Sequence, residues 1–151
     1  ESLSLEGVRG RMIDLTVELQ NADGIMDGSR NSGNPNQEAL DVYNEFRIEL
    51  ARNEEYTTVF TYDRKRQILE IDRTWSGMQR DVICTRKLQI TDDRQNLKLR
   101  FILDRSSIEL FINDGSKTAT TVIPTPVEAD EILFHSDGNA VIQVEKYDIV
   151  L

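Results

Sequence analysis

Apolar and polar residues alternate between Leu99 and Gly115, on both sides of a polar break at residues 104–106. Successive side chains of a β-strand point to opposite faces, so this alternation predicts two strands that each bury one face. The stretch ends in Asn113, Asp114 and Gly115, residue types that tolerate the positive φ of a tight hairpin turn. The pattern therefore predicts consecutive antiparallel strands and favours an all-β fold.

The same pattern of short strands continues through the rest of the chain. No stretch sustains a helical period for three turns, and turn residues recur about every ten positions. Asp137 and Gly138 predict a hairpin between the last two strands. Short strands at this spacing are typical of a sandwich or a barrel. The predicted strands cover residues 13–19, 46–50, 56–62, 68–72, 82–90, 97–103, 108–112, 118–123, 132–134 and 140–151.

The bulk composition restricts the class of protein. With 151 residues, the chain is long enough for one domain that buries a core without disulfides or metals. Its net charge of −9 argues against nucleic acid and anionic membranes as partners. Cys84 is the single cysteine, which excludes an internal disulfide and fits a reducing compartment. Residues 1–6 lack the features of a signal peptide, so we predict a cytoplasmic protein.

One loop has a partial match to a calcium site. Asp27, Ser29, Asn31 and Glu38 fall at ligand positions of such a loop, but the glycine that the loop needs is displaced to Gly33. We therefore interpret this segment as a solvated loop. No metal or cofactor is predicted for the chain.

The residues of other catalytic or metal sites are too few or badly placed. His135 and Cys84 are the single residues of their types, whereas a zinc site needs several such ligands. His135, Ser136 and Asp137 have the composition of a hydrolase triad. Neighbouring residues on a strand point to opposite faces, so these three cannot act as base, nucleophile and acid.

Two Asp-Arg motifs each follow an apolar strand. They are Asp72-Arg73-Thr74 and Asp104-Arg105-Ser106. The preferred interpretation is that Asp and Ser or Thr cap the strand end while Arg pairs locally.

Both motifs lie in segments that resemble glycoside hydrolase family 32. Residues 62–63 and 69–77 resemble the family's Y-D and L-x-x-D-R-S-x-S-G segment, and residues 99–115 resemble its D-R-S-S-x-E-x-F-x-N-D-G signature. The resemblance implies the C-terminal domain of invertases, sucrose-6-phosphate hydrolases and fructan hydrolases. It further implies a two-layer antiparallel β-sandwich, lectin-like (concanavalin A-like), with about 10–12 strands. Residues 1–10 are then a linker or tail from an N-terminal propeller, and residues 11–151 form the sandwich.

The resemblance places the family's chemistry in that five-bladed propeller, in W-x-N-D-P-N-G, R-D-P and E-C motifs. None of them is complete in this chain. Residues 113–115 lack the flanking Trp and the Pro-Asn, Arg80-Asp81 is followed by Val82, and Cys84 is preceded by Ile83. No catalytic residue is therefore predicted here, and hydrolysis belongs to the parent protein.

Trp75 is the single tryptophan and lies in a predicted loop. A lone Trp more often anchors a loop to a core or an interface than it stacks on a sugar ring. We take Trp75, Asp72, Arg73, Asp104 and Arg105 as the candidate sugar or interface contacts.

Three functions are compatible with the sequence. The main hypothesis is a non-catalytic C-terminal sandwich of a β-fructofuranosidase, with sucrose-6-phosphate hydrolase as the preferred parent, that braces the propeller and can add an oligomer interface. The alternatives are a free-standing carbohydrate-binding module and a calcium-stabilised adhesion domain. Apolar residues on the second face of several strands, among them Val59, Ile68 and Phe111, predict that part of one outer face abuts the propeller.

Overall fold

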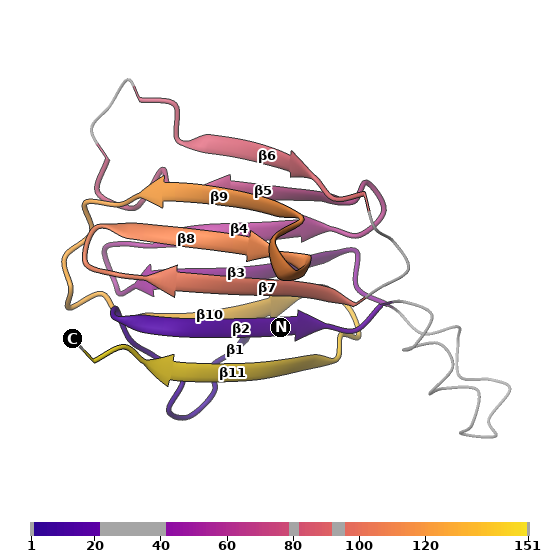
Figure 1. Ribbon diagram of the computed structural model, residues 1–151, viewed down its shortest axis with the longest axis horizontal. Helices are drawn as coiled ribbons and strands as arrows, with labels where there is room; N and C mark the ends of the chain where they lie inside the picture. The colour runs from indigo at the N-terminus through magenta and orange to yellow at the C-terminus, as the bar shows by residue number, and fades with distance from the viewer. Residues whose placement is uncertain (1, 22–41, 79–81, 92–95, 151) are drawn as a thin grey trace, which may run out of the picture.

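The computed structural model describes residues 2–21, 42–78, 82–91 and 96–150. These residues form two antiparallel sheets packed face to face, with the five-stranded sheet in front in Figure 1. The strand order is β1-β10-β3-β4-β5-β6 in one sheet and β11-β2-β7-β8-β9 in the other. The described residues contain no α-helix, and none of their segments is a helix that could cross a membrane. The predicted all-β sandwich is confirmed.

The strands are short and follow the predicted segments closely. The six-stranded sheet contains β1 (Ser2–Leu3), β10 (Glu131–Ser136), β3 (Glu45–Arg52), β4 (Thr58–Asp63), β5 (Ile68–Asp72) and β6 (Thr85–Gln89). The five-stranded sheet contains β11 (Ile142–Asp148), β2 (Ile13–Leu19), β7 (Leu97–Leu103), β8 (Ser107–Ile112) and β9 (Lys117–Val122). A single 3₁₀ turn, η1 (Asn113–Gly115), joins β8 to β9, and Asn113 and Asp114 have the positive φ that the sequence predicts there.

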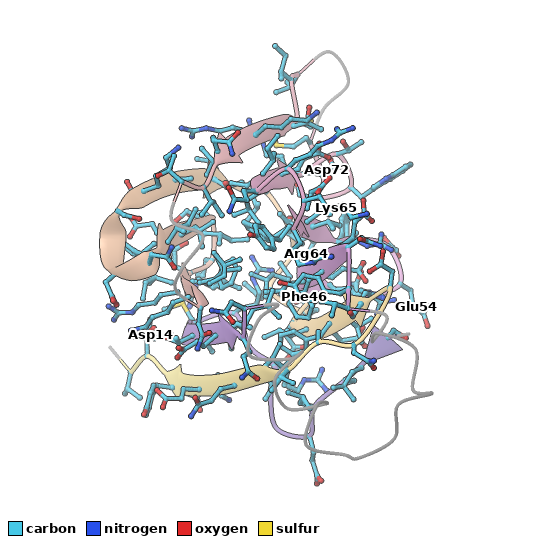
Figure 2. The ribbon with its side chains drawn as sticks, turned by 90° about the vertical axis from the view of Figure 1, so that its right-hand side faces the viewer. Asp14, Phe46, Glu54, Arg64, Lys65 and Asp72 are labelled. Atoms are coloured by element: carbon cyan, nitrogen blue, oxygen red, sulfur yellow. The ribbon has the colours of Figure 1, made fainter. Side chains whose placement is uncertain are left out.

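The core lies between the sheets and contains the inward residues of each alternating strand. In β2, residues 13, 15, 17 and 19 are buried while the residues between them are half-exposed. Phe60 from β4 and Phe101 from β7 meet edge to face across the core, with ring centroids 4.9 Å apart. Figure 2 shows Phe46 between the layers and Asp14 on the outer face of the five-stranded sheet. In strands that alternate in this way, burial of one face fixes the register.

The predicted hairpin at Asp137 and Gly138 is wrong. β10 belongs to the six-stranded sheet and β11 to the five-stranded sheet, so the segment between them crosses from one layer to the other. Asp137 instead accepts hydrogen bonds through Oδ1 from the backbone amides of Asn44, at 2.7 Å, and Glu45, at 3.0 Å. An Asp that caps the start of another strand has the same local signature as an Asp in a hairpin turn.

The segment for which a linker or tail is predicted contacts the sandwich. β1 pairs with β10, and the backbone at Arg9 forms a bridge with Glu131. The Arg9 side chain also makes an ion pair of 2.5 Å with Asp130. The described part of residues 1–10 is thus attached to the six-stranded sheet.

The outer sheet faces are less apolar than the sequence suggests. Val59, Ile68 and Phe111 are half-buried, because each lies opposite a long polar side chain on the neighbouring strand. The register pairs them with Glu49, Gln89 and Arg100 respectively. The strongly exposed apolar side chains on these faces are other residues, Tyr147 of β11 and Val122 of β9.

We expect the contact between the two Phe rings to be critical for stability. Phe101→Ala should reduce the free energy of unfolding by about 3–5 kcal/mol, because Phe101 is fully buried and its removal leaves a cavity. Urea unfolding followed by circular dichroism measures this. The matched control is Val150→Ala at a highly exposed site, which should change stability by less than about 0.5 kcal/mol. Equal losses in both variants would contradict this account of the core.

Candidate functional site

One end of the sandwich brings together the turns that carry both Asp-Arg motifs. The connections β3–β4, β5–β6, β7–β8 and β9–β10 all lie at the left in Figure 1. We call this region the Trp75 end and define it as residues 53–57, 73–78, 82–84, 104–106 and 122–130. All five candidate contact residues lie in this region or, like Asp72, directly beside it.

The two Asp side chains cap their own turns, as predicted. Asp72 Oδ1 accepts hydrogen bonds from the backbone amide of Thr74, at 2.9 Å, and from its hydroxyl, at 2.5 Å. Asp104 Oδ1 accepts from the backbone amides of Ser106, at 2.8 Å, and Ser107, at 2.6 Å. Both carboxylates therefore stabilise the turns that they begin.

The prediction that each Arg pairs locally is wrong for Arg73, which bonds to a distant segment. Arg73 donates through Nη1 to the carbonyl of Val122, at 2.8 Å, which links the six-stranded sheet to the end of β9 in the five-stranded sheet. The Arg73 amide also donates to the carbonyl of Cys84, at 2.9 Å. Arg105 exposes its side chain. Contacts of these residues with a sugar or a partner stay a prediction.

Arg11, which sequence reasoning missed, holds the Trp75 end together from inside. It is 5% exposed, and its guanidinium donates to four backbone carbonyls. The acceptors are Arg105 at 2.9 Å, Thr125 at 3.0 Å, Pro126 at 2.5 Å and Ala129 at 3.4 Å. Burial lowers the pKa of Arg11, which nevertheless stays cationic. An Arg before an apolar strand has no sequence signature that distinguishes it from a surface residue.

Gly10 places Arg11 in this position. Its φ is +146°, and its amide donates to the carbonyl of Asp130, at 2.9 Å. A Cβ atom at this position would lie 2.5 Å from Cγ2 of Ile13, so only glycine fits.

Apolar side chains are exposed in the same region as these hydrogen bonds. Trp75 is 68% exposed, Ile83 is 85% exposed and Val122 is 59% exposed. The loop beneath Trp75 is fixed, because its carbonyl accepts from the amide of Thr57 and buried Ser76 is bonded to Thr125. Trp75 therefore does not anchor a core, and its contact with an interface or a sugar ring stays a prediction.

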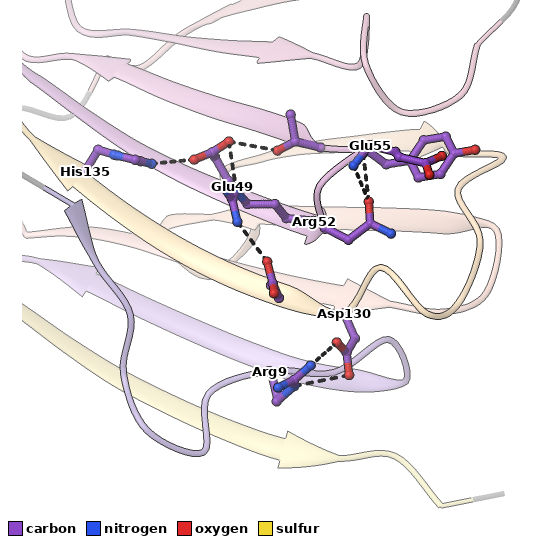
Figure 3. A network of polar contacts seen from close by, with 10 residues as sticks. Arg9, Glu49, Arg52, Glu55, Asp130 and His135 are labelled. Atoms are coloured by element: carbon purple, nitrogen blue, oxygen red, sulfur yellow. Dashed lines mark hydrogen bonds and ion pairs between the residues drawn. The ribbon is translucent and has the colours of Figure 1, made fainter.

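The structure does not assemble the hydrolase-like triplet. His135 Nε2 contacts Glu49 Oε2, in a network that continues through Arg52 (Figure 3). Ser136 Oγ donates to the carbonyl of Gly138, and Asp137 accepts backbone amides. Among the residues that the structure describes, no three His, Cys, Asp or Glu side chains are grouped to hold a metal ion. The partial calcium motif at residues 27–38 lies outside the described residues.

Comparison with known proteins identifies the fold and its family. Residues 1–150 match the family model described as "Glycosyl hydrolases family 32 C terminal". The chain belongs to this family. The family predicted from the two Asp-Arg motifs is thereby confirmed.

Relatives of this family 32 domain are bacterial enzymes. A probable sucrose-6-phosphate hydrolase of Vibrio cholerae serotype O1 is 36% identical over 89 residues, which are 58% of this chain and 16% of the relative. The sucrose-6-phosphate hydrolase of Staphylococcus xylosus is 32% identical over 115 residues, which are 74% of this chain and 22% of the relative. The matched region thus spans less than a quarter of either relative.

Solved structures confirm the lectin-like sandwich. An exo-inulinase from Aspergillus awamori aligns with a TM-score of 0.74 and 20% identity, over 99% of this chain and 26% of that chain. Sheep galectin-11 aligns with a TM-score of 0.55 and 14% identity, over 97% of this chain and 95% of that chain. At these identities the likeness concerns the fold of the family 32 domain alone.

Arg11 gives a direct test of the polar framework. Arg11→Met keeps an unbranched side chain but removes every donor, so the buried carbonyls of Thr125 and Ala129 lose their hydrogen bonds from Arg11. We expect a loss of about 3 kcal/mol or more in the free energy of unfolding. Arg11→Lys should lose less, because it keeps the charge and some donors. The control is Arg105→Met at the exposed neighbouring position, and an equal loss there would argue against the role of Arg11.

Acid should weaken the domain through Glu49 and Asp104. Burial raises the pKa of Glu49, but hydrogen bonds from His135 and Thr57, with the charges of His135 and Arg52, outweigh it and lower the pKa overall. The amide of Ser106 is the main cause of the lowered pKa of Asp104. A lowered folded-state pKa stabilises the domain above the unfolded value of about 4, and this stability is lost as pH falls through the folded value.

The corresponding measurement is urea unfolding of Glu49→Gln and Asp104→Asn between pH 7 and pH 3. The stability difference from the unmodified chain should be largest at pH 7 and shrink below about pH 4. The control Glu54→Gln alters an exposed carboxylate and should show no such pH dependence. A difference that stays constant across the range would rule out this origin of acid sensitivity.

Proposed function

We propose that this chain is the non-catalytic C-terminal sandwich of a β-fructofuranosidase, with sucrose-6-phosphate hydrolase as the preferred parent. Three observations support the proposal. The family model covers residues 1–150, and the two bacterial relatives are named as hydrolases of that substrate. The sequence contains none of the complete catalytic motifs expected of the family's propeller. Hydrolysis then takes place in the N-terminal propeller of the same polypeptide.

The role that we propose for the sandwich is to brace that propeller through the Trp75 end. The observation that carries this proposal is the exposure of Trp75, Ile83 and Val122 on a rigid, internally bonded framework. Large exposed apolar side chains that lie together mark interaction surfaces. Interfaces between domains of one chain bury about 600–1,500 Å², a size that one end of a small sandwich can provide.

A second role follows from the same surface. Without the propeller, the Trp75 end is exposed and can pair with another copy of the chain, so an oligomer interface is our second candidate function. A sugar ring stacked on Trp75 is the remaining alternative for this surface. We also propose a cytoplasmic location, which the single cysteine and the bacterial relatives support.

The bracing role is tested in the parent enzyme with the double variant Trp75→Ser/Ile83→Ser. Loss of two anchors should destabilise the assembled enzyme by about 2 kcal/mol or more, because buried aromatic anchors carry most of an interface's energy. The thermal midpoint and the half-life of activity at elevated temperature report this loss. The isolated sandwich should keep its own midpoint, since both side chains are exposed in it.

The matched control is Tyr147→Ser/Val150→Ser, which removes two exposed apolar side chains outside the Trp75 end. It should leave the parent enzyme's stability unchanged. Sedimentation velocity of the isolated sandwich over a concentration series should show self-association that the Trp75 double variant abolishes. A parent enzyme indifferent to the Trp75 double variant would overturn the bracing role.

A further inference from the structure

A groove lies on the outer face of the five-stranded sheet, which points toward the viewer in Figure 1. It has a volume of about 390 Å³, which falls within the range of about 300–1,000 Å³ typical of small-molecule sites. Its residues come from β2, β7, β8, β11 and the turn η1. None of them belongs to the Trp75 end, so the two surfaces are separate.

The strand register sets the width of the groove. Glu145, Thr16, Arg100 and Phe111 lie in one row across β11, β2, β7 and β8. Strands are spaced by about 4.8 Å, so the outer two strands of this row are roughly 14 Å apart. Tyr147 lies one outward position along β11 and is 64% exposed. The groove is therefore too wide to clamp one ring between two aromatic faces, but it suits two sugar rings in line across the strands.

The polar lining is rich in paired charges. Asp14 and Arg100 are joined by two hydrogen bonds, at 3.0 Å and 2.7 Å, and Lys98 contacts Asp114 at 2.8 Å. Each of the two lining cations is thus already bonded to a carboxylate, and Glu145 adds a further negative charge. An anionic ligand would gain no unpaired cation in this groove and would be repelled by the excess carboxylate.

This chemistry fits a ligand with many hydroxyl groups and no charge. Carboxylates accept hydrogen bonds from adjacent hydroxyls, the guanidinium donates to ring and hydroxyl oxygens, and such charge-assisted bonds are the stronger ones. The rings of Tyr147 and Phe111 offer apolar area for the C–H faces of a sugar. We propose that this groove is a binding site for an uncharged oligosaccharide of about two rings, separate from the Trp75 end.

The test uses the isolated chain and three probes: sucrose, a neutral fructo-oligosaccharide, and sucrose 6-phosphate as the anionic counterpart. We expect two-dimensional amide NMR to show shifts centred on residues 14–16, 98–100, 111 and 145–147 with the neutral sugars. The dissociation constant should be millimolar or tighter. Sucrose 6-phosphate should bind at least several-fold more weakly than sucrose, because the groove has excess negative charge.

Variants separate the groove from the rest of the molecule. Tyr147→Ala should weaken sugar binding by about tenfold, since Tyr147 supplies exposed stacking area. Asp14→Asn/Arg100→Gln removes both charges and the guanidinium donors, and it should also weaken binding while the melting curve stays cooperative. The control Trp75→Ala should bind the neutral sugars as the unmodified chain does.

Three results would overturn the proposal. The first is the absence of amide shifts in the groove at roughly 20 mM neutral sugar, a concentration well above a millimolar dissociation constant. The others are tighter binding of sucrose 6-phosphate than of sucrose, and sugar binding that is lost in Trp75→Ala but kept in Tyr147→Ala. The last result would transfer the sugar site to the Trp75 end. Because the bracing role depends on Trp75 and Ile83 and is measured in the parent enzyme, either proposal can fail without the other.

Discussion

The Trp75 end of the sandwich depends on the hydrogen bonds that the buried guanidinium of Arg11 donates to backbone carbonyls. A cation taken out of water is costly unless its donors are satisfied, and here backbone carbonyls from two connections supply acceptors for both terminal nitrogens, while the buried Nε has none. One of these connections joins β9 to β10 and so passes from one sheet to the other. The hydrogen bonds of Arg11 therefore connect this crossover and the β7–β8 turn to the segment that leads into β2.

A fixed polar framework has a consequence for the surface above it. At the Trp75 end, the capping Asp residues and Arg73 use their polar groups internally. Charged side chains such as Glu54 and Arg105 are exposed there, and large exposed apolar side chains, Trp75 and Ile83, distinguish this end. The face of the five-stranded sheet has the opposite character, because its charges lie in the open around a hollow. One small domain thus presents two surfaces of different chemistry.

The sequence alone was sufficient to predict the features that depend on residues close together in the chain. The alternation of apolar and polar residues predicted where the strands lie, because a strand with one buried face repeats every two residues, as β2 and β7 do. Capping by Asp72 and Asp104 was predictable because these bonds span two or three residues. Pairings between distant segments had no such signal. Asp137 was misassigned to a hairpin because its partners, at the start of β3, lie far away in the sequence.

The same reason explains why the sequence revealed neither Arg11 nor the groove. The acceptors of Arg11 come from segments about a hundred residues further along the chain. The groove forms only when β11, β2, β7 and β8 lie side by side in one register. Its residues are outward positions of four strands and one residue of η1, and no strand taken alone shows that these positions surround a groove.

The position of β2 also affects the order in which the domain can fold. β2 lies between β7 and β11, the strand described nearest the end of the chain, so both of its neighbours are synthesised long after it. When strands that are far apart in the sequence pair with each other, the contact order is high and folding is slow. On the ribosome, the five-stranded sheet cannot close until Ile142–Asp148 has emerged. Until then the edge of β2 that pairs with β11 has no partner, and the nascent domain is exposed to aggregation and to chaperones during that interval.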